Sequence, residues 1–272
     1  MNQKLSYSPA AFTTATLSSR DRWIVYAGVF FVSAIGWAYM AYMAWAMENM
    51  HLVDMWMPPR GGARPWTGYD FWMLFAMWAV MMVAMMTPSV IPMVMLYATV
   101  NKGKREKGLP YAPTFIFLGG YLGAWTIYSL GATIVQYPLH ESGLLNPMMN
   151  SRSYLMSGAI LVVAGIYQWT PIKDACLHEC RSPLSFLMTS WRDGNFGAFK
   201  MGLHHGLYCV GCCWALMAIL FSVGVMNMLW VVLLTVFVLL EKVLPVPPFY
   251  VRALTGLVFI VWGGYWLSLY PW

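Results

Sequence analysis

Apolar residues in this chain occur in long runs that are separated by short polar or proline-containing segments. Seven of these runs approach the ~20 residues that a helix needs to cross the hydrocarbon core of a bilayer. The pattern predicts an all-α, polytopic transmembrane helical bundle of about seven helices, with residues 1–272 forming a single integral membrane domain. The expected spans are about 24–46, 71–100, 114–136, 153–171, 204–224, 227–243 and 250–270.

Three features interrupt the apolar runs. Pro88 and Pro92 remove backbone donors inside the second run and predict a break in that helix. The turn around Met226 and Asn227 is so short that the fifth and sixth runs should form a helical hairpin. The more polar stretch 173–200, which contains two cysteines, is expected to be a cytoplasmic loop.

The composition agrees with this class of protein and excludes others. Hydrophobic residues make up 60% of the chain and charged residues only 10%, against about 25% charged in an ordinary globular chain. A soluble fold of this size cannot bury so much apolar surface, so soluble enzymes and secreted disulfide scaffolds are excluded. The net charge of +6 forms no contiguous basic stripe and therefore does not indicate nucleic-acid binding.

The basic residues predict an orientation. With seven crossings and a cytoplasmic N-terminus, thirteen Lys and Arg residues fall inside and three fall outside, which follows the positive-inside rule. We therefore expect the N-terminus inside and the C-terminus outside. The inner set is Lys4, Arg20, Arg22, Lys102, Lys104, Arg105, Lys107, Lys173, Arg181, Arg192, Lys200, Lys242 and Arg252, and the outer set is Arg60, Arg64 and Arg152.

The strongest chemical signal is a group of sulfur and imidazole side chains in the fifth run. At about 100° per residue, Cys209 lies about 40° from His205 around the helix. Cys212 and Cys213 lie at about −20° and about 80°, so the four side chains share one face. Donors on a single helix cannot all close on one tetrahedral ion, and a second segment should supply further ligands.

Cys176 and Cys180, four residues apart in the stretch 173–200, are the predicted suppliers. Cytoplasmic cysteines stay reduced, which favours metal ligation over a disulfide. The alternative is that the cysteines are small buried apolar side chains, but two motifs with a histidine in phase favour a metal site. His178 would point away from its neighbouring cysteines on a helix, and His204 lies on a different face from His205.

Methionine is the second signal, with 23 residues in the chain. In the second run Met73, Met77, Met81 and Met85 recur every four residues, with Met82 and Met86 beside them, so thioethers line one broad face. Packing alone explains such a stripe as well as a ligand row does, and both interpretations stay open. The candidate ligands are Met81, Met82, Met85 and Met86.

Sulfur donors determine the expected metal. Soft thioether and thiolate ligands select Cu(I), and zinc is the second candidate, because one imidazole with two or three thiolates suits either ion. Carboxylates are almost absent from the apolar runs. Glu241 and Lys242 lie near the inner end of the sixth run, where we expect both side chains to reach water. Met40, Met43, Met47 and Met50 form a further methionine stripe in the outer half of the first run. These outer methionines and the inner Cys/His group predict a route of rising Cu(I) affinity.

Three stretches between residues 78 and 242 carry a family resemblance. They are MMVAMMTPSVIPM (81–93), CLHECRSPLSF (176–186) and GLHHGLYCVGCCW (202–214). Together they resemble the bacterial predicted metal-binding integral membrane proteins, a family built on a domain of unknown function. The resemblance implies metal binding and a membrane location, and it implies no reaction or substrate.

The leading hypothesis is a protein of the bacterial inner (cytoplasmic) membrane that handles Cu(I), by transport or by delivery, through Met, Cys and His ligands. The alternative is a membrane oxidoreductase or an accessory subunit with a redox metal or a structural zinc. Neither a Walker loop nor an ATPase aspartate motif is present, so active pumping by this chain alone is not expected. A role other than an enzyme is favoured, and the enzyme alternative stays open. The expected partners are the bilayer, a metal ion, and another membrane protein or a metallochaperone, without nucleic acid.

Overall fold

The structure, a computed structural model, describes residues 17–59, 64–146, 149–244 and 248–270. Over these ranges it is helical, and the only β pairing is an isolated bridge between Leu145 and Ser151. The all-α prediction is therefore confirmed. The helices are α1 (Ser19–Glu48), α2 (Gly68–Met86), the 3₁₀ helix η2 (Pro88–Val90), α3 (Ile91–Glu106), α4 (Thr114–Glu141), α5 (Tyr154–Gln168), α6 (Pro171–Arg181), α7 (Pro183–Ser190), α8 (Gly194–Ala218), α9 (Leu220–Val223), α10 (Met228–Val243) and α11 (Pro248–Ser268).

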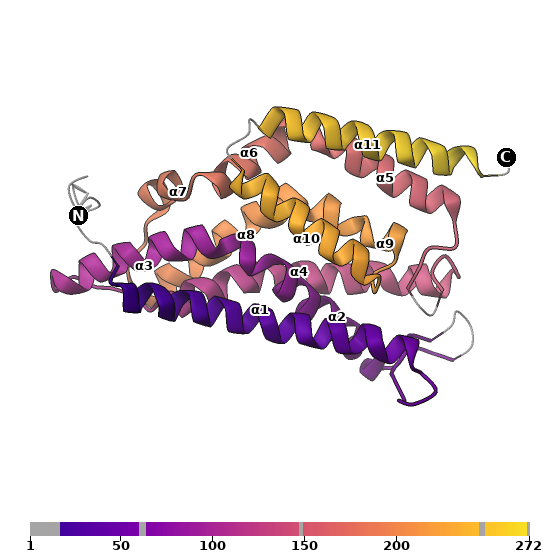
Figure 1. Cartoon of the computed structure of the whole chain (residues 1–272), viewed down its shortest axis with the longest axis horizontal. Coiled ribbons are helices and arrows are strands. Elements are labelled where there is room, and N and C mark those ends of the chain that lie inside the picture. Colours follow the sequence, from indigo (N-terminus) through magenta and orange to yellow (C-terminus); the bar gives the residue numbers. More distant parts are fainter. Residues whose placement is uncertain (1–16, 60–63, 147–148, 245–247, 271–272) are drawn as a thin grey trace.

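The longer helices lie roughly parallel to the long axis of the molecule (Figure 1). Five are long and apolar enough to cross a bilayer, and α5 with α6, bent by 65° at their junction, would add a sixth span. The 16 residues of α10 rise only about 24 Å, less than the ~30 Å hydrocarbon core. The described helices thus provide five or six candidate spans, fewer than the seven expected from the sequence.

One expected segment has its predicted form and another differs from it. The second run is broken at its prolines, as predicted: α2 ends at Met86, Pro88 begins η2, and Pro92 lies in the first turn of α3. At this break the hydroxyl of Ser89 donates to the carbonyl of Met86 at 2.9 Å. The stretch 173–200 is not an irregular loop, because α6, α7 and the first turns of α8 occupy most of it.

Large apolar side chains cover the outside of the bundle as well as filling its core. Large apolar side chains point outward on α1, α4 and α11, among them Phe30, Phe31, Ile127, Ile134 and Val261. The interior holds polar and charged groups that are almost fully buried, including Gln136 and His140 of α4. Such a surface is stable where hydrocarbon is the solvent, and the interior is where a membrane protein keeps its functional polar groups.

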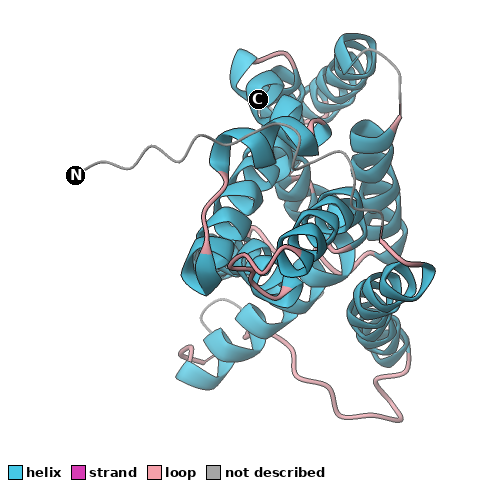
Figure 2. Ribbon diagram, turned by 90° about the vertical axis from the view of Figure 1, so that its left-hand side faces the viewer, coloured by secondary structure: helices cyan, strands magenta, loops and turns pink. Residues whose placement is uncertain are grey.

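Figure 2 shows the bundle with several of its helices seen nearly end-on. The most extensive helix contact lies between α4 and α8, which run side by side through the middle of the bundle (Figure 1). Glycines on both helices permit it. A Cβ atom on Gly120 would collide with the carbonyl oxygen of Phe199. One on Gly206 would lie 2.7 Å from the Cβ of Ala124 and 2.8 Å from the backbone carbonyl oxygen of Tyr121. Small residues let helix backbones approach in this way when the surrounding solvent is lipid.

Adjacent glycines of α4 offer a matched test of this contact. A Cβ on Gly119 meets nothing within 4 Å, whereas one on Gly120 meets the backbone of α8. Gly120→Ala should destabilise the protein by about 1–3 kcal/mol through overpacking, and Gly119→Ala should be neutral or stabilising by up to ~1 kcal/mol through helix propensity. Unfolding of both variants in detergent measures the difference, and equal stabilities would contradict the contact.

Candidate metal centre

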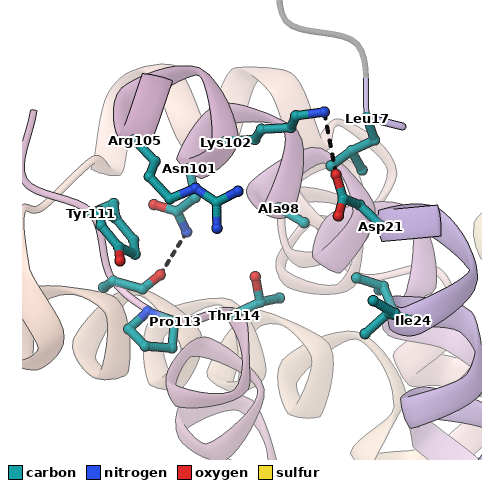
Figure 3. A pocket seen from close by; sticks show the side chains of 12 residues that line it. Leu17, Asp21, Ile24, Ala98, Asn101, Lys102, Arg105, Tyr111, Pro113 and Thr114 are labelled. Carbon is teal, nitrogen blue, oxygen red and sulfur yellow. Dashed lines mark hydrogen bonds and ion pairs between the residues drawn. The ribbon is translucent and has the colours of Figure 1, made fainter. Parts of the chain in front are cut away.

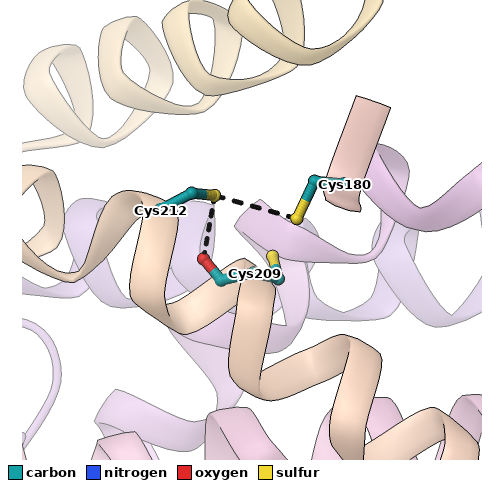
Figure 4. Close-up of side chains that lie close together, drawn as sticks. All are labelled: Cys180, Cys209 and Cys212. Carbon is teal, nitrogen blue, oxygen red and sulfur yellow. Dashed lines mark hydrogen bonds between the residues drawn. The ribbon is translucent and has the colours of Figure 1, made fainter. Parts of the chain in front are cut away.

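Three cysteine sulfurs converge inside the bundle from two helices. Cys180 belongs to the last turn of α6, and Cys209 and Cys212 lie one turn apart on α8 (Figure 4). Their Sγ atoms all lie within 4.8 Å of one another, and those of Cys180 and Cys212 are 3.9 Å apart. We call these three residues the thiol group.

This spacing matches the dimensions of a metal–thiolate site. Three sulfurs bonded at ~2.3 Å to one ion in a plane would lie about 4 Å from each other. Cys209 and Cys212 are each 1% exposed, and Cys180 is partly exposed. The thiol group contains no carboxylate, so its donor chemistry is soft and suits Cu(I) or Zn²⁺ better than a hard ion.

The other two predicted cysteines border the thiol group. The Sγ of Cys213 lies 3.8 Å from that of Cys212 but donates to the backbone carbonyl of Cys209 at 2.8 Å. Cys176 packs against α8, where a Cβ atom on Gly211 would lie 2.7 Å from its sulfur. The structure therefore brings three of the five cysteines into one group.

The histidines of α8 face opposite environments, as the helix phase predicts. His205 is 3% exposed, and its ring packs against Phe186 at 5.0 Å and Tyr121 at 6.1 Å between centroids. Its Nδ1 atom is buried without a hydrogen-bond partner, but the ring is not part of the thiol group. His204 is exposed, and His178 of α6 is exposed as well.

All four candidate methionines of α2, Met81, Met82, Met85 and Met86, are buried, with exposed fractions of 0 or 1%. They belong to the large apolar core, so packing and metal binding both remain open for their sulfurs. The end of this helix is connected to the thiol group through Tyr121. Its hydroxyl donates to the carbonyl of Met86 at 3.2 Å and lies 3.1 Å from the Sγ of Cys209.

Lys242 is a functional candidate that the sequence analysis placed wrongly. Instead of reaching water, its Nζ donates to the Sγ of Cys209 at 2.9 Å and to the hydroxyl of Ser89 at 3.1 Å. The ammonium thus lies between the thiol group and the break after α2. The available signal was an ionisable residue inside an apolar run, which by default indicates function.

The neighbouring Glu241 is also buried and does not reach water. Lys173 of α6 places its Nζ 2.9 and 3.0 Å from the two carboxylate oxygens, and both side chains are almost fully buried. Arg181 adds bonds to the carbonyls of Glu241 and Leu244 at the end of α10. We call these contacts the α6–α10 clasp.

The clasp positions both sides of the candidate centre. Arg181 and Glu241 belong to the clasp and join α6 to α10. Their sequence neighbours lie at the centre: Cys180 is one of its three cysteines, and Lys242 donates to the sulfur of Cys209. Because the ionised partners are inaccessible to water, their mutual placement is strongly constrained. The clasp therefore fixes where Cys180 and Lys242 meet α8.

A cavity elsewhere in the fold does not offer a soft-metal site. It has a volume of about 300 Å³ and lies between α1, the end of α3 and the start of α4 (Figure 3). Its lining contains no cysteine, histidine or methionine. An ion pair between Lys102 and Asp21 at 3.2 Å lies at its edge. The thiol group is therefore the better candidate for metal binding.

Apolar helices with an internal group of thiols define a helical metal-related protein that is compatible with a membrane. The chain belongs to the PpoB2 family, described as copper chaperone, whose model matches residues 75–266. The match begins within α2, extends over most of α11, and includes the thiol group and the clasp. It confirms the resemblance to a metal-related bacterial family and associates the chain with copper. Neither the curated proteins nor the solved structures include a match.

The clasp can be tested by a double-mutant cycle. Glu241→Leu or Lys173→Met leaves one buried charge without its partner and should cost about 3–5 kcal/mol of stability. The double variant Lys173→Met with Glu241→Leu removes both charges and should recover most of that loss. Unfolding in detergent provides the four free energies. Single variants as stable as the wild type would show that the pair does not hold the two helices.

Proposed function

We propose that the chain is a multi-pass protein of the bacterial inner membrane that accepts Cu(I) at the thiol group and delivers it to another membrane protein or metallochaperone. The observation that carries this proposal is the convergence of three sulfurs from α6 and α8 inside an apolar bundle. Membership of a copper chaperone family supports copper as the ion. Delivery, and not enzymatic turnover, is the proposed role.

Ligand exchange is the proposed transfer step. Cu(I) accepts two or three thiolate ligands, so an incoming thiolate or thioether can replace one donor before the others leave. Cys180 is the least buried donor of the thiol group and belongs to the 11-residue helix α6. We infer that Cys180 is the ligand that exchanges, while Cys209 and Cys212 hold the ion on α8.

Further donors are proposed around this centre. His205, with an unpartnered Nδ1 one helical turn before Cys209, is available as a fourth ligand after a change of its ring orientation. Cys213 and Cys176 lie next to the thiol group and are proposed as alternative donors. The methionines 81, 82, 85 and 86 are proposed as a route along α2 toward the helix break, where Tyr121 contacts both Met86 and Cys209.

The proposed topology has seven spans, with the N-terminus in the cytoplasm and the C-terminus outside. α1 begins and α11 ends at opposite ends of the molecule, which supports an odd number of crossings (Figure 1). α10 is proposed as a short span that the clasp holds within the bundle. The thirteen-to-three distribution of basic residues supports the orientation.

A structural zinc is the second candidate, because the thiol group joins two different helices. A structural ion would be required for folding and would exchange slowly. A delivered Cu(I) ion would leave a folded protein behind and would pass to a thiol acceptor. Metal removal followed by an unfolding measurement distinguishes the two: a marked loss of stability without metal would favour structural zinc.

Metal content of the purified protein tests the ligand assignment. Cys180→Ser, Cys209→Ser and Cys212→Ser should each lower bound copper severalfold, because a site with two or three donors loses one of them. His204→Ala, which changes an exposed neighbour on α8, should retain wild-type copper. Equal copper in all four variants would contradict the thiol group as the site.

Copper bound to the protein during growth in cells tests the methionine route. Replacing Met81, Met82, Met85 and Met86 together by Leu nearly conserves volume and should cost less than about 1.5 kcal/mol per site. If the thioethers carry Cu(I), copper loading of the thiol group should fall while protein levels stay normal. Unchanged loading would identify the four side chains as packing alone.

Reporter fusions test the topology. Alkaline phosphatase, which is active only outside the cytoplasm, should be active when fused after residue 272 and inactive when fused after Lys107. A fluorescent protein that matures in the cytoplasm should give the opposite pattern at the two positions. Cytoplasmic location of both fusion points would mean an even number of spans between Lys107 and residue 272, and would contradict the proposal.

A further inference from the structure

We propose that Lys242 determines the metal selectivity of the thiol group by favouring a monovalent over a divalent ion. This inference rests on the proposed function, since it concerns the same site. Lys242 provides no electron pair to the metal in this role. It acts through the positive charge that it places 2.9 Å from the sulfur of Cys209.

The surroundings of Lys242 leave the thiol group as its electrostatic partner. Glu241, the nearest acidic residue in the sequence, is engaged by Lys173 in the clasp. No carboxylate among the described residues forms an ion pair with Lys242, and its other bond is to the neutral hydroxyl of Ser89. An ammonium inside an apolar bundle requires a compensating negative charge, and metal-bound thiolates supply one.

Charge arithmetic gives the direction of the selectivity. Thiols bind metals as thiolates, so two thiolates with a monovalent ion carry a net charge of about −1, and with a divalent ion about 0. With three thiolates the charges are about −2 and about −1. At either ligand number the monovalent complex is more negative by one unit. A fixed ammonium beside it therefore stabilises the monovalent complex more than the divalent one.

The clasp keeps this charge in place. Lys242 lies in the last turn of α10, whose final carbonyls accept hydrogen bonds from Arg181. Ser89 holds the ammonium from the opposite side, at the helix break. The charge is thus anchored between three elements, and it does not need to reorganise when an ion enters the thiol group.

Competition titrations of the purified, full-length protein in detergent test the proposal. Cu(I) affinity is measured against bathocuproine disulfonate, and Zn²⁺ affinity against a chromophoric zinc chelator. In Lys242→Met the ratio of Cu(I) to Zn²⁺ affinity should fall by about tenfold or more, which corresponds to ~1.4 kcal/mol. Lys242→Arg keeps the charge and should retain most of the wild-type ratio.

A second substitution tests the same charge without removing it. Ser89→Asp places a carboxylate beside the ammonium, neutralises it, and should also shift the ratio toward Zn²⁺. Ser89→Asn has the same size and can still accept a hydrogen bond from the ammonium but carries no charge, so it should not shift the ratio. Ser89→Asp keeps the buried lysine paired, so it decides the question if Lys242→Met does not fold. Lys200→Met removes an exposed charge that lies over the ring of Phe196 on the same helix as the cysteines, and it serves as the charge control.

The outcomes are distinct. Equal losses for both ions in Lys242→Met, with Ser89→Asp at the wild-type ratio, would mean that Lys242 only supports the fold and would overturn the inference. Wild-type affinities for both ions in both variants would show that the charge of Lys242 has no effect on binding, and would overturn the inference as well. If the wild-type protein itself binds no Cu(I), or binds it independently of the three cysteines, the proposed function fails before the selectivity question arises.

Discussion

The placement of buried charge at the junction of α6 and α10 is the constraint on which the candidate centre depends. Lys173 and Glu241 are shielded from water, so each requires the other within contact distance. Meeting that requirement brings the end of α6 against the end of α10, where Arg181 bonds the last carbonyls. Cys180 and Lys242 are then carried to the same place because each is the sequence neighbour of a residue in the clasp.

The second constraint is steric and determines how α8, which carries Cys209 and Cys212, packs against α4. Glycines allow α8 to lie directly against α4, so the hydroxyl of Tyr121 reaches the sulfur of Cys209. The same hydroxyl bonds the carbonyl at the end of α2. A larger residue at Gly206 would push the cysteine face of α8 away from this contact. The donor geometry is therefore a product of backbone approach as well as of side-chain identity.

Charge and softness together give the centre its chemical character. Sulfur donors prefer soft ions, and the family assignment associates the chain with copper. Lys242 adds a positive charge at the sulfurs without adding a donor. A site of this kind is suited to binding an anionic metal–thiolate complex inside a bundle whose outer surface is apolar. The buried charges of Lys173 and Glu241 join the helices at this centre, and Lys242 contacts one of its sulfurs.

The sequence by itself determined the all-helical class, the apolar runs and the inward phase of Cys209, Cys212 and His205, because helical periodicity fixes which residues share a face. It also indicated the break at the prolines. Only the tertiary structure decided that Cys180 joins the thiol group while Cys176 and Cys213 border it, and that Lys242 turns inward. Those outcomes depend on distances between helices, which arise from glycine contacts and ion pairing between residues far apart in the chain.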